Sequence, residues 1–128
     1  MKSDIFEPQL HALCSALSRL RIAPQQSEYQ LHQQIAAALR DGGFVVQHEV
    51  SLAPRCRIDF LVGSVGIEVK RGKPARSTLI AQCSRYLESD RLTGLLVVLD
   101  KSISLPSKIN NKPVAVFSLN RLWGIALG

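Results

Sequence analysis

The feature that most constrains the fold is a continuous apolar run, bounded by turn residues, from Thr93 to Asp100. Its short length and flanking turn residues are typical of a β-strand rather than a helix. A strand without alternating polar residues is buried on both faces, so other layers must cover both sides of its sheet. The run therefore predicts an α/β architecture in which helices pack on both faces of a sheet.

Spacing and capping patterns predict the elements around this strand. Ser27 and Gln30 form a capping-box pattern at the start of one helix, and Gly42-Gly43 ends it. The unit over 65–100 is strand, helix, strand, which implies a parallel crossover within a mixed sheet. In chain order, the expected elements are helices at 8–21 and 28–41, strands at 44–50, 55–62 and 65–70, a helix at 75–89, strands at 93–100 and 113–119, and a short C-terminal helix at 120–127.

Composition narrows the class of protein. No repeat or composition break divides the 128 residues, so residues 1–128 are expected to form a single domain. The formal net charge of +6 favours a polyanionic partner, of which nucleic acid is the commonest. No apolar run reaches membrane-spanning length, and the N-terminus has no apolar signal region. We therefore expect a cytoplasmic protein with no membrane partner.

Cysteine and histidine spacing does not suggest a zinc site. The three cysteines lie far apart, which is typical of buried thiols in a reducing compartment. The histidines, at positions 11, 32 and 48, have no metal-ligand spacing with one another or with the cysteines. They are interpreted as structural or surface residues.

A hairpin signal, Gly63 to Gly66, joins the second and third expected strands. Either a two-residue or a four-residue loop is expected to pair Val62 with Ile67. That register would place Asp59 opposite Lys70 and Leu61 opposite Glu68. The pairing sets which side chains of the two strands become neighbours.

Because side chains alternate along a strand, Asp59, Glu68 and Lys70 are expected to share one face. The opposite face would be apolar, formed by Ile58, Phe60, Val62, Ile67 and Val69. Two neighbouring carboxylates repel each other unless a cation offsets their charge. Oxygen ligands suit Mg²⁺ or Mn²⁺, and a lysine beside such an ion can act on the attacking water in phosphodiester hydrolysis.

The motif formed by Asp59, eight intervening residues and Glu68-Val69-Lys70 resembles the signature of the PD-(D/E)XK nuclease superfamily. The αβββαβ core of that restriction-endonuclease-like fold is matched in order by residues of about 27–100. The first helix and the C-terminal strand and helix would be additions. Ile58 stands where the signature often has proline.

The resemblance implies roles for the residues of the motif. Asp59 and Glu68 would be direct metal ligands, together with the Val69 carbonyl, and Lys70 would act on the nucleophilic water. Glu28, in the first turn of the first core helix, would hold the metal directly or through water. The alternative for Glu28 is a favourable interaction with the helix dipole alone.

Gln82 and Tyr86 resemble the QxxxY motif of RecB-like members of the superfamily. The resemblance implies that they position the DNA backbone or the catalytic lysine; the alternative is an ordinary helix-surface and core pair. Basic residues near the acidic pair are expected to grip phosphates, or else to form a solvated positive surface. These nucleic-acid-binding candidates are Arg55, Arg57, Arg71, Lys73, Arg76 and Arg85.

The expected function is a Mg²⁺-dependent DNA nuclease, with Mn²⁺ able to substitute. An endonuclease of repair, recombination, restriction or mobile-element biology is favoured, and RNA is not excluded as a substrate. The alternative is a non-catalytic or partner-dependent nucleic-acid-binding subunit of the same fold. A homodimer and a larger nucleoprotein assembly both stay open.

Overall fold

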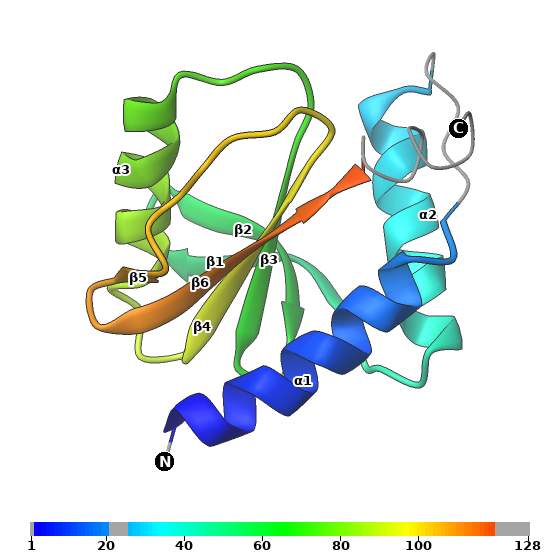
Figure 1. Ribbon diagram of the computed structural model, residues 1–128, viewed down its shortest axis with the longest axis horizontal. Coiled ribbons are helices and arrows are strands. Elements are labelled where there is room, and N and C mark those ends of the chain that lie inside the picture. The colour runs from blue at the N-terminus through cyan, green and yellow to red at the C-terminus, as the bar shows by residue number, and fades with distance from the viewer. Residues whose placement is uncertain (1, 21–25, 120–128) are drawn as a thin grey trace.

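The computed structural model describes residues 2–20 and 26–119, with the side chains of residues 2–7 left undescribed (Figure 1). The described elements are α1 (Lys2–Leu17), α2 (Glu28–Asp41), β1 (Gln47–Ala53), β2 (Cys56–Val62), β3 (Val65–Lys70), α3 (Arg76–Tyr86), β4 (Gly94–Leu99), β5 (Lys108–Ile109) and β6 (Lys112–Ser118). Within these residues, no helix has the length and apolar character needed to cross a membrane.

The strands form one six-stranded mixed sheet in the order β1-β2-β3-β4-β6-β5. The pairs β1–β2, β2–β3 and β5–β6 are antiparallel, whereas β3–β4 and β4–β6 are parallel. Helix α3 makes the crossover from β3 to β4 on one side of the sheet, and α1 and α2 lie on the other side (Figure 1). The predicted α/β class, with a mixed sheet between helices, is confirmed.

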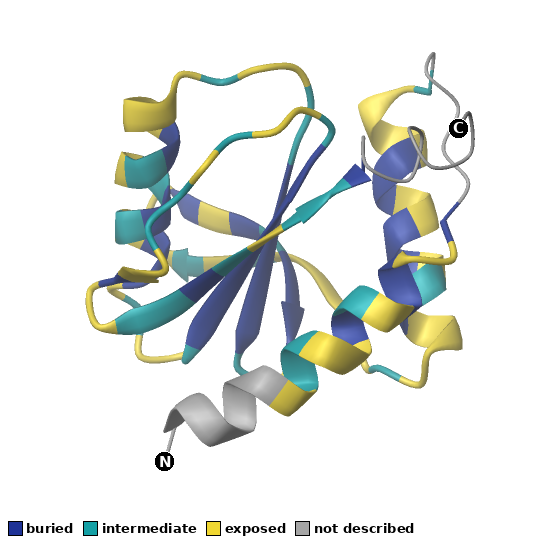
Figure 2. Cartoon of the chain, viewed as in Figure 1, coloured by how far each residue is buried: buried dark blue, intermediate teal, exposed yellow. Residues whose placement is uncertain are grey.

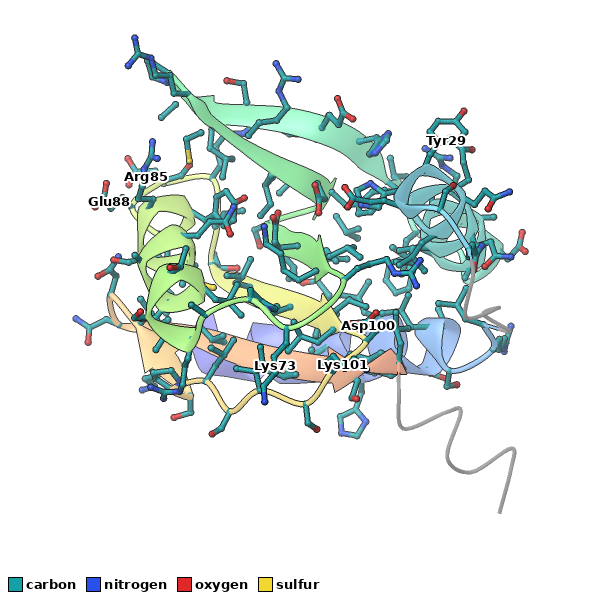
Figure 3. The ribbon with its side chains drawn as sticks, turned by 90° about the horizontal axis from the view of Figure 1, so that it is seen from above. Tyr29, Lys73, Arg85, Glu88, Asp100 and Lys101 are labelled. Atoms are coloured by element: carbon teal, nitrogen blue, oxygen red, sulfur yellow. The ribbon has the colours of Figure 1, made fainter. Side chains whose placement is uncertain are left out.

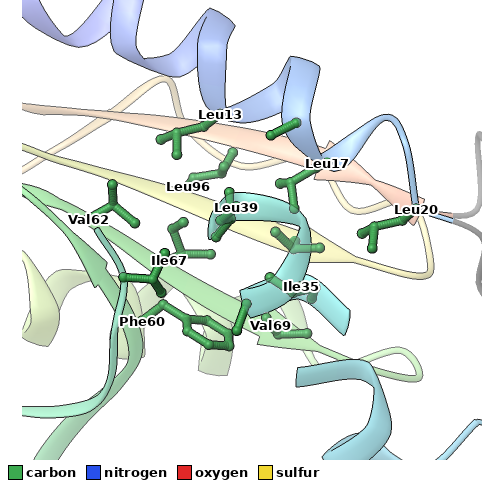
Figure 4. Close-up of a cluster of buried hydrophobic side chains, with 14 of the residues drawn as sticks. Leu13, Leu17, Leu20, Ile35, Leu39, Phe60, Val62, Ile67, Val69 and Leu96 are labelled. Carbon is green, nitrogen blue, oxygen red and sulfur yellow. The ribbon is translucent and has the colours of Figure 1, made fainter. Parts of the chain in front are cut away.

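Strand β4 is buried along its whole length, as its unbroken apolar sequence predicts (Figure 2). Its alternate residues enter two separate hydrophobic clusters. Leu96 and Val98 pack with the buried faces of α1 and α2 (Figure 4), and Leu95, Val97 and Leu99 pack toward α3. Burial on both faces therefore holds the sheet between its helical layers.

The turn between β2 and β3 differs from the prediction. Gly63 and Ser64 alone form the loop, and the observed pairs are Val62–Val65 and Phe60–Ile67. Gly63 has a φ of 60°, which the first position of a type II′ hairpin turn requires. The expected pairing of Val62 with Ile67 is wrong by two residues, so Asp59 does not lie opposite Lys70.

The expected apolar face of the hairpin is also corrected. Phe60, Val62, Ile67 and Val69 belong to the cluster beneath α1 and α2, as expected, whereas Ile58 packs in the cluster beneath α3. Leu61, three residues after Ile58, lies in the same α3-side cluster. Phe60, Leu61 and Val62 alternate regularly between the two clusters, whereas Ile58 and Phe60, two residues apart, lie in different clusters. The alternation of β2 is therefore interrupted at Asp59.

Several element boundaries also shift. Helix α1 begins well before residue 8, so Pro8 lies inside the helix rather than in its first turn. At this position Pro8 is exposed to solvent. Strand β1 starts at Gln47 instead of residue 44, and the short β5 was not expected. The expected C-terminal helix at 120–127 lies outside the described residues.

Candidate active site

Strands β2 and β3 stop pairing through their backbones after Phe60 and Ile67. Beyond that pair, side chains make the cross-strand hydrogen bonds. The Val69 N–H donates to Asp59 Oδ2 at 2.8 Å, and the Asp59 N–H donates to Glu68 Oε1 at 3.3 Å. Each acid thus binds the backbone of the opposite strand, and both carboxylates are held where the strands separate. We call this point, between Asp59 and Glu68, the fork.

Glu68 and Lys70 project from β3 toward α3, as alternate residues of one strand. Lys70 Nζ lies 3.2 Å from Glu68 Oε2, and the Glu68 side chain is only 5% exposed. The predicted shared face therefore holds for Glu68 and Lys70. Asp59 departs from it, because the interrupted alternation of β2 turns its carboxylate into the fork and toward α2.

Burial and like charge both disfavour ionisation of the two acids. Burial, followed by the negative charge of Asp59, raises the pKa of Glu68 to about 7, and Lys70 opposes that rise. Burial also raises the pKa of Asp59, against the opposing effects of the Val69 N–H, His32 and Lys70. Burial is therefore the main obstacle to ionisation of both acids, and for Glu68 the negative charge of Asp59 adds to it.

Helix α3 brings Gln82 and Tyr86 to Glu68. Gln82 Nε2 lies 2.9 Å from Tyr86 Oη and 3.5 Å from Glu68 Oε2, so its amide group spans the two side chains. The buried Tyr86 hydroxyl donates to the Arg57 carbonyl at 3.3 Å. The two residues, one helical turn apart, therefore tie α3 to both β2 and β3 beside the carboxylates.

On the other side of the fork, Asp59 borders a surface hollow of about 400 Å³. We call it the α2 hollow. Glu28, the exposed first residue of α2, lines it, and its charge raises the pKa of Asp59. The structure thus brings Glu28 to the Asp59 side of the fork, away from Glu68. The lining residues are Glu28, Tyr29, His32, His48, Glu49, Arg57 and Asp59.

Two of these lining residues are histidines that sequence reasoning did not assign to the site. His32 Nε2 lies 3.7 Å from Asp59 Oδ2, and His32 Nδ1 lies 3.4 Å from His48 Nε2. Only His32 could have been assigned from the sequence, because it follows Glu28 by one helical turn and so lies on the same helix face. His48 could not be assigned without the strand register, because it reaches the site by pairing with Phe60 across β1 and β2.

The predicted basic residues fall into two groups, separated on the surface as Arg85 and Lys73 are in Figure 3. The first group lies around the β1–β2 turn and the end of α3, where Arg85 donates to the Arg55 carbonyl at 3.3 Å. The second group lies in the loop after β3 and at the start of α3. The groups are Arg55, Arg57 and Arg85, and then Arg71, Lys73 and Arg76.

Several of these cations already have protein partners. Arg57 lies 3.5 Å from Glu49, and Arg71 lies 3.5 Å from Asp100 and also donates to the Gln26 carbonyl. Such partners hold the guanidinium groups in place and offset part of their charge. Lys73 is exposed in the loop that follows β3.

The donor set of the fork fits a magnesium-type ion on its chemistry. Across residues 2–20 and 26–119, no group of three or more histidine, cysteine, aspartate or glutamate side chains is arranged to hold a metal ion. Mg²⁺ usually takes only one or two carboxylates and completes its shell with water and phosphate oxygens. The fork offers two carboxylates held close together, so Asp59 and Glu68, with the Val69 carbonyl, are the residues that could hold the ion.

Comparison with known protein families, curated proteins and solved structures finds no match to this chain.

Proposed function

We propose that this chain is a metal-dependent nuclease of the PD-(D/E)XK type that hydrolyses phosphodiester bonds of DNA. The observation that carries the proposal is the contact of Lys70 with Glu68 at 3.2 Å, next to an Asp59 carboxylate fixed by the Val69 N–H. The order α2-β1-β2-β3-α3-β4 supports a restriction-endonuclease-like core. An endonuclease is the favoured form of the activity.

We assign each residue the role that its contacts support. Asp59 and Glu68 would hold a Mg²⁺ or Mn²⁺ ion, which when bound would offset charge on the scissile phosphate and lower the pKa of water. The Lys70 ammonium, held beside Glu68, would orient the attacking water and stabilise negative charge that develops on the phosphate. Gln82 fixes the Glu68 carboxylate from the α3 side and so positions it.

The function is tested by DNA cleavage with the purified chain. Circular, linear, single-stranded and branched DNA would each be incubated with Mg²⁺, with Mn²⁺ and with a chelator. We expect metal-dependent cutting that falls at least about a hundredfold in Lys70→Ala, because a positioned group of this kind typically contributes that much or more. Lys108→Ala is the matched control, since Lys108 is an exposed lysine on β5, at the far edge of the sheet.

Equal cutting by Lys70→Ala and the wild type would reject the site and indicate a contaminating nuclease. DNA binding without cutting on any substrate would favour the non-catalytic or partner-dependent alternative.

A further inference from the structure

Tyr29 is an exposed aromatic side chain at the mouth of the α2 hollow. It is 71% exposed on the first turn of α2, and Figure 3 shows it at the surface beside that helix. The other exposed large hydrophobic residues of the described chain are Val45 and Val116, neither of which is aromatic. Exposure of a large ring costs hydration free energy, and such rings often supply contact surface for a partner.

The hollow behind Tyr29 contains further rings. The His48 ring stacks on Phe60 at a centroid distance of 4.8 Å and an interplanar angle of 17°. The His32 ring lies 5.4 Å from Phe60 and 5.6 Å from His48. The wall of the hollow therefore presents ring surfaces fixed by packing, next to the exposed ring of Tyr29.

The charge of the hollow argues against a phosphate occupant. Its lining includes three carboxylates, from Glu28, Glu49 and Asp59, and a single arginine. That arginine, Arg57, is already paired with Glu49 at 3.5 Å. Unless a bound cation or the neighbouring histidines offset these charges, a phosphate would meet net repulsion there, whereas an uncharged planar group would not.

We propose that the α2 hollow binds an unpaired nucleobase, stacked on Tyr29, of the strand whose phosphate lies at the fork. The base would enter beside Asp59, next to the phosphate that the proposed nuclease cuts, so this assignment of the phosphate rests on the proposed function. A base inside a duplex has both faces covered by its neighbours, and it must be unstacked and unpaired before it can enter a pocket. The substrate class that follows is single-stranded DNA, or the unpaired strand of a flap or frayed end.

A binding measurement tests the base site without cleavage. A single-stranded oligonucleotide containing 2-aminopurine would be titrated with the Lys70→Ala protein, in which cutting is expected to be largely lost. Quenching of the 2-aminopurine fluorescence would report stacking, and the variants below would be made in the same Lys70→Ala background. Removing the ring with Tyr29→Ala should weaken binding about five- to a hundredfold, as loss of one base–aromatic stack typically does. Tyr29→Phe should retain binding, and Val45→Ala, which removes another exposed side chain, should leave it unchanged.

Wild-type affinity and quenching in the Tyr29→Ala protein would overturn the proposal, as would equal affinity for the fully paired duplex. Absence of DNA binding by every variant would overturn it as well.

A cleavage measurement separates this proposal from the nuclease proposal. In the otherwise wild-type protein, Tyr29→Ala should lower the kcat/KM for single-stranded DNA and reduce the preference for single strands over duplex. Quenching that depends on Tyr29 without any cutting would retain the base site and reject the nuclease. Cutting that is unchanged in Tyr29→Ala would retain the nuclease and reject the base site.

Discussion

At the scale of single residues, Glu68 should make the stability of the metal-free protein depend on pH. The pKa of Glu68 is about 7 in the folded chain, whereas the ordinary value for glutamate is 4.5. Burial is the larger cause of this rise, and the negative charge of Asp59 is the second. Between these values the folded state binds more protons than the unfolded state, so the free energy of unfolding falls as pH rises through that window. The loss persists above pH of about 7.

Glu68→Gln removes this ionisation, so we expect the metal-free variant to be more stable than the wild type at pH 8, by on the order of 2 kcal/mol. The difference should shrink as pH falls toward about 4.5, and well below that pH wild-type Glu68 is protonated in both states. Urea unfolding from pH 5 to pH 8 in the presence of a chelator measures it.

Parallel stability curves for the two proteins would show that Glu68 titrates normally. Added Mg²⁺ at pH 8 should stabilise the wild type and not Glu68→Gln, because only a ligand that binds the folded state raises its stability.

The residues of the fork could be predicted from sequence, but their surroundings only in part. The motif predicted that Asp59, Glu68 and Lys70 lie close together. Helical spacing predicted that Gln82 and Tyr86 share one face of a helix. The turn of Asp59 out of its expected face was not predictable, because it depends on where β2 and β3 separate. For the same reason His48, which arrives on β1, could not be assigned to the site.

At the scale of elements, the β2–β3 hairpin shows which error in strand register leaves the predicted side-chain faces unchanged. The sequence Gly63 to Gly66 allows more than one loop, and the observed loop shifts the strand register by two residues from the expectation. A shift of two leaves the alternation of each strand unchanged, so Glu68 and Lys70 still face the same side. A shift of one would have moved both into the cluster beneath α1 and α2.

A substitution at Gly66 tests this register. In the observed register Gly66 faces the α3-side cluster so closely that there is no room for a side chain. A Cβ at this position would lie 2.5 Å from Ile58 Cδ1 and 3.1 Å from Leu92 Cδ1, and both of these side chains are fully buried. We expect Gly66→Ala to destabilise the fold by about 1–3 kcal/mol through overpacking. Thermal or urea unfolding measures the change.

The double variant Gly66→Ala with Ile58→Val removes the closest clashing carbon. It should therefore lose less stability than the two single variants added together. Additive losses would contradict the contact between Gly66 and Ile58.

At the scale of the whole molecule, the layered architecture could be predicted because a few local patterns demand it. The apolar run of β4 requires cover on both faces, and the crossover through α3 supplies it on one side. The sheet order beyond β4 was not predictable, since β6 joins in parallel and the two-residue β5 carries no pattern of its own. Nor could the sequence show that α1 begins before Pro8.

The charge of the whole molecule predicts how DNA binding depends on salt. With a net charge of +6, the logarithm of the binding constant should fall linearly with the logarithm of the salt concentration. Each phosphate contact contributes about 0.7–0.9 to the magnitude of the slope. Lys73 lies in the loop just after the fork and is exposed, so Lys73→Ala should reduce the slope by about that amount.

Lys108→Ala removes the same charge at the opposite edge of the sheet and should leave the slope unchanged. Fluorescence anisotropy of a labelled oligonucleotide, measured from about 50 to 200 mM salt, compares the three proteins. Equal reductions in both variants would mean that DNA responds only to net charge and not to the loop. A flat response in the wild type would mean that the basic residues do not grip phosphates at all, and that binding depends on contacts such as stacking on Tyr29.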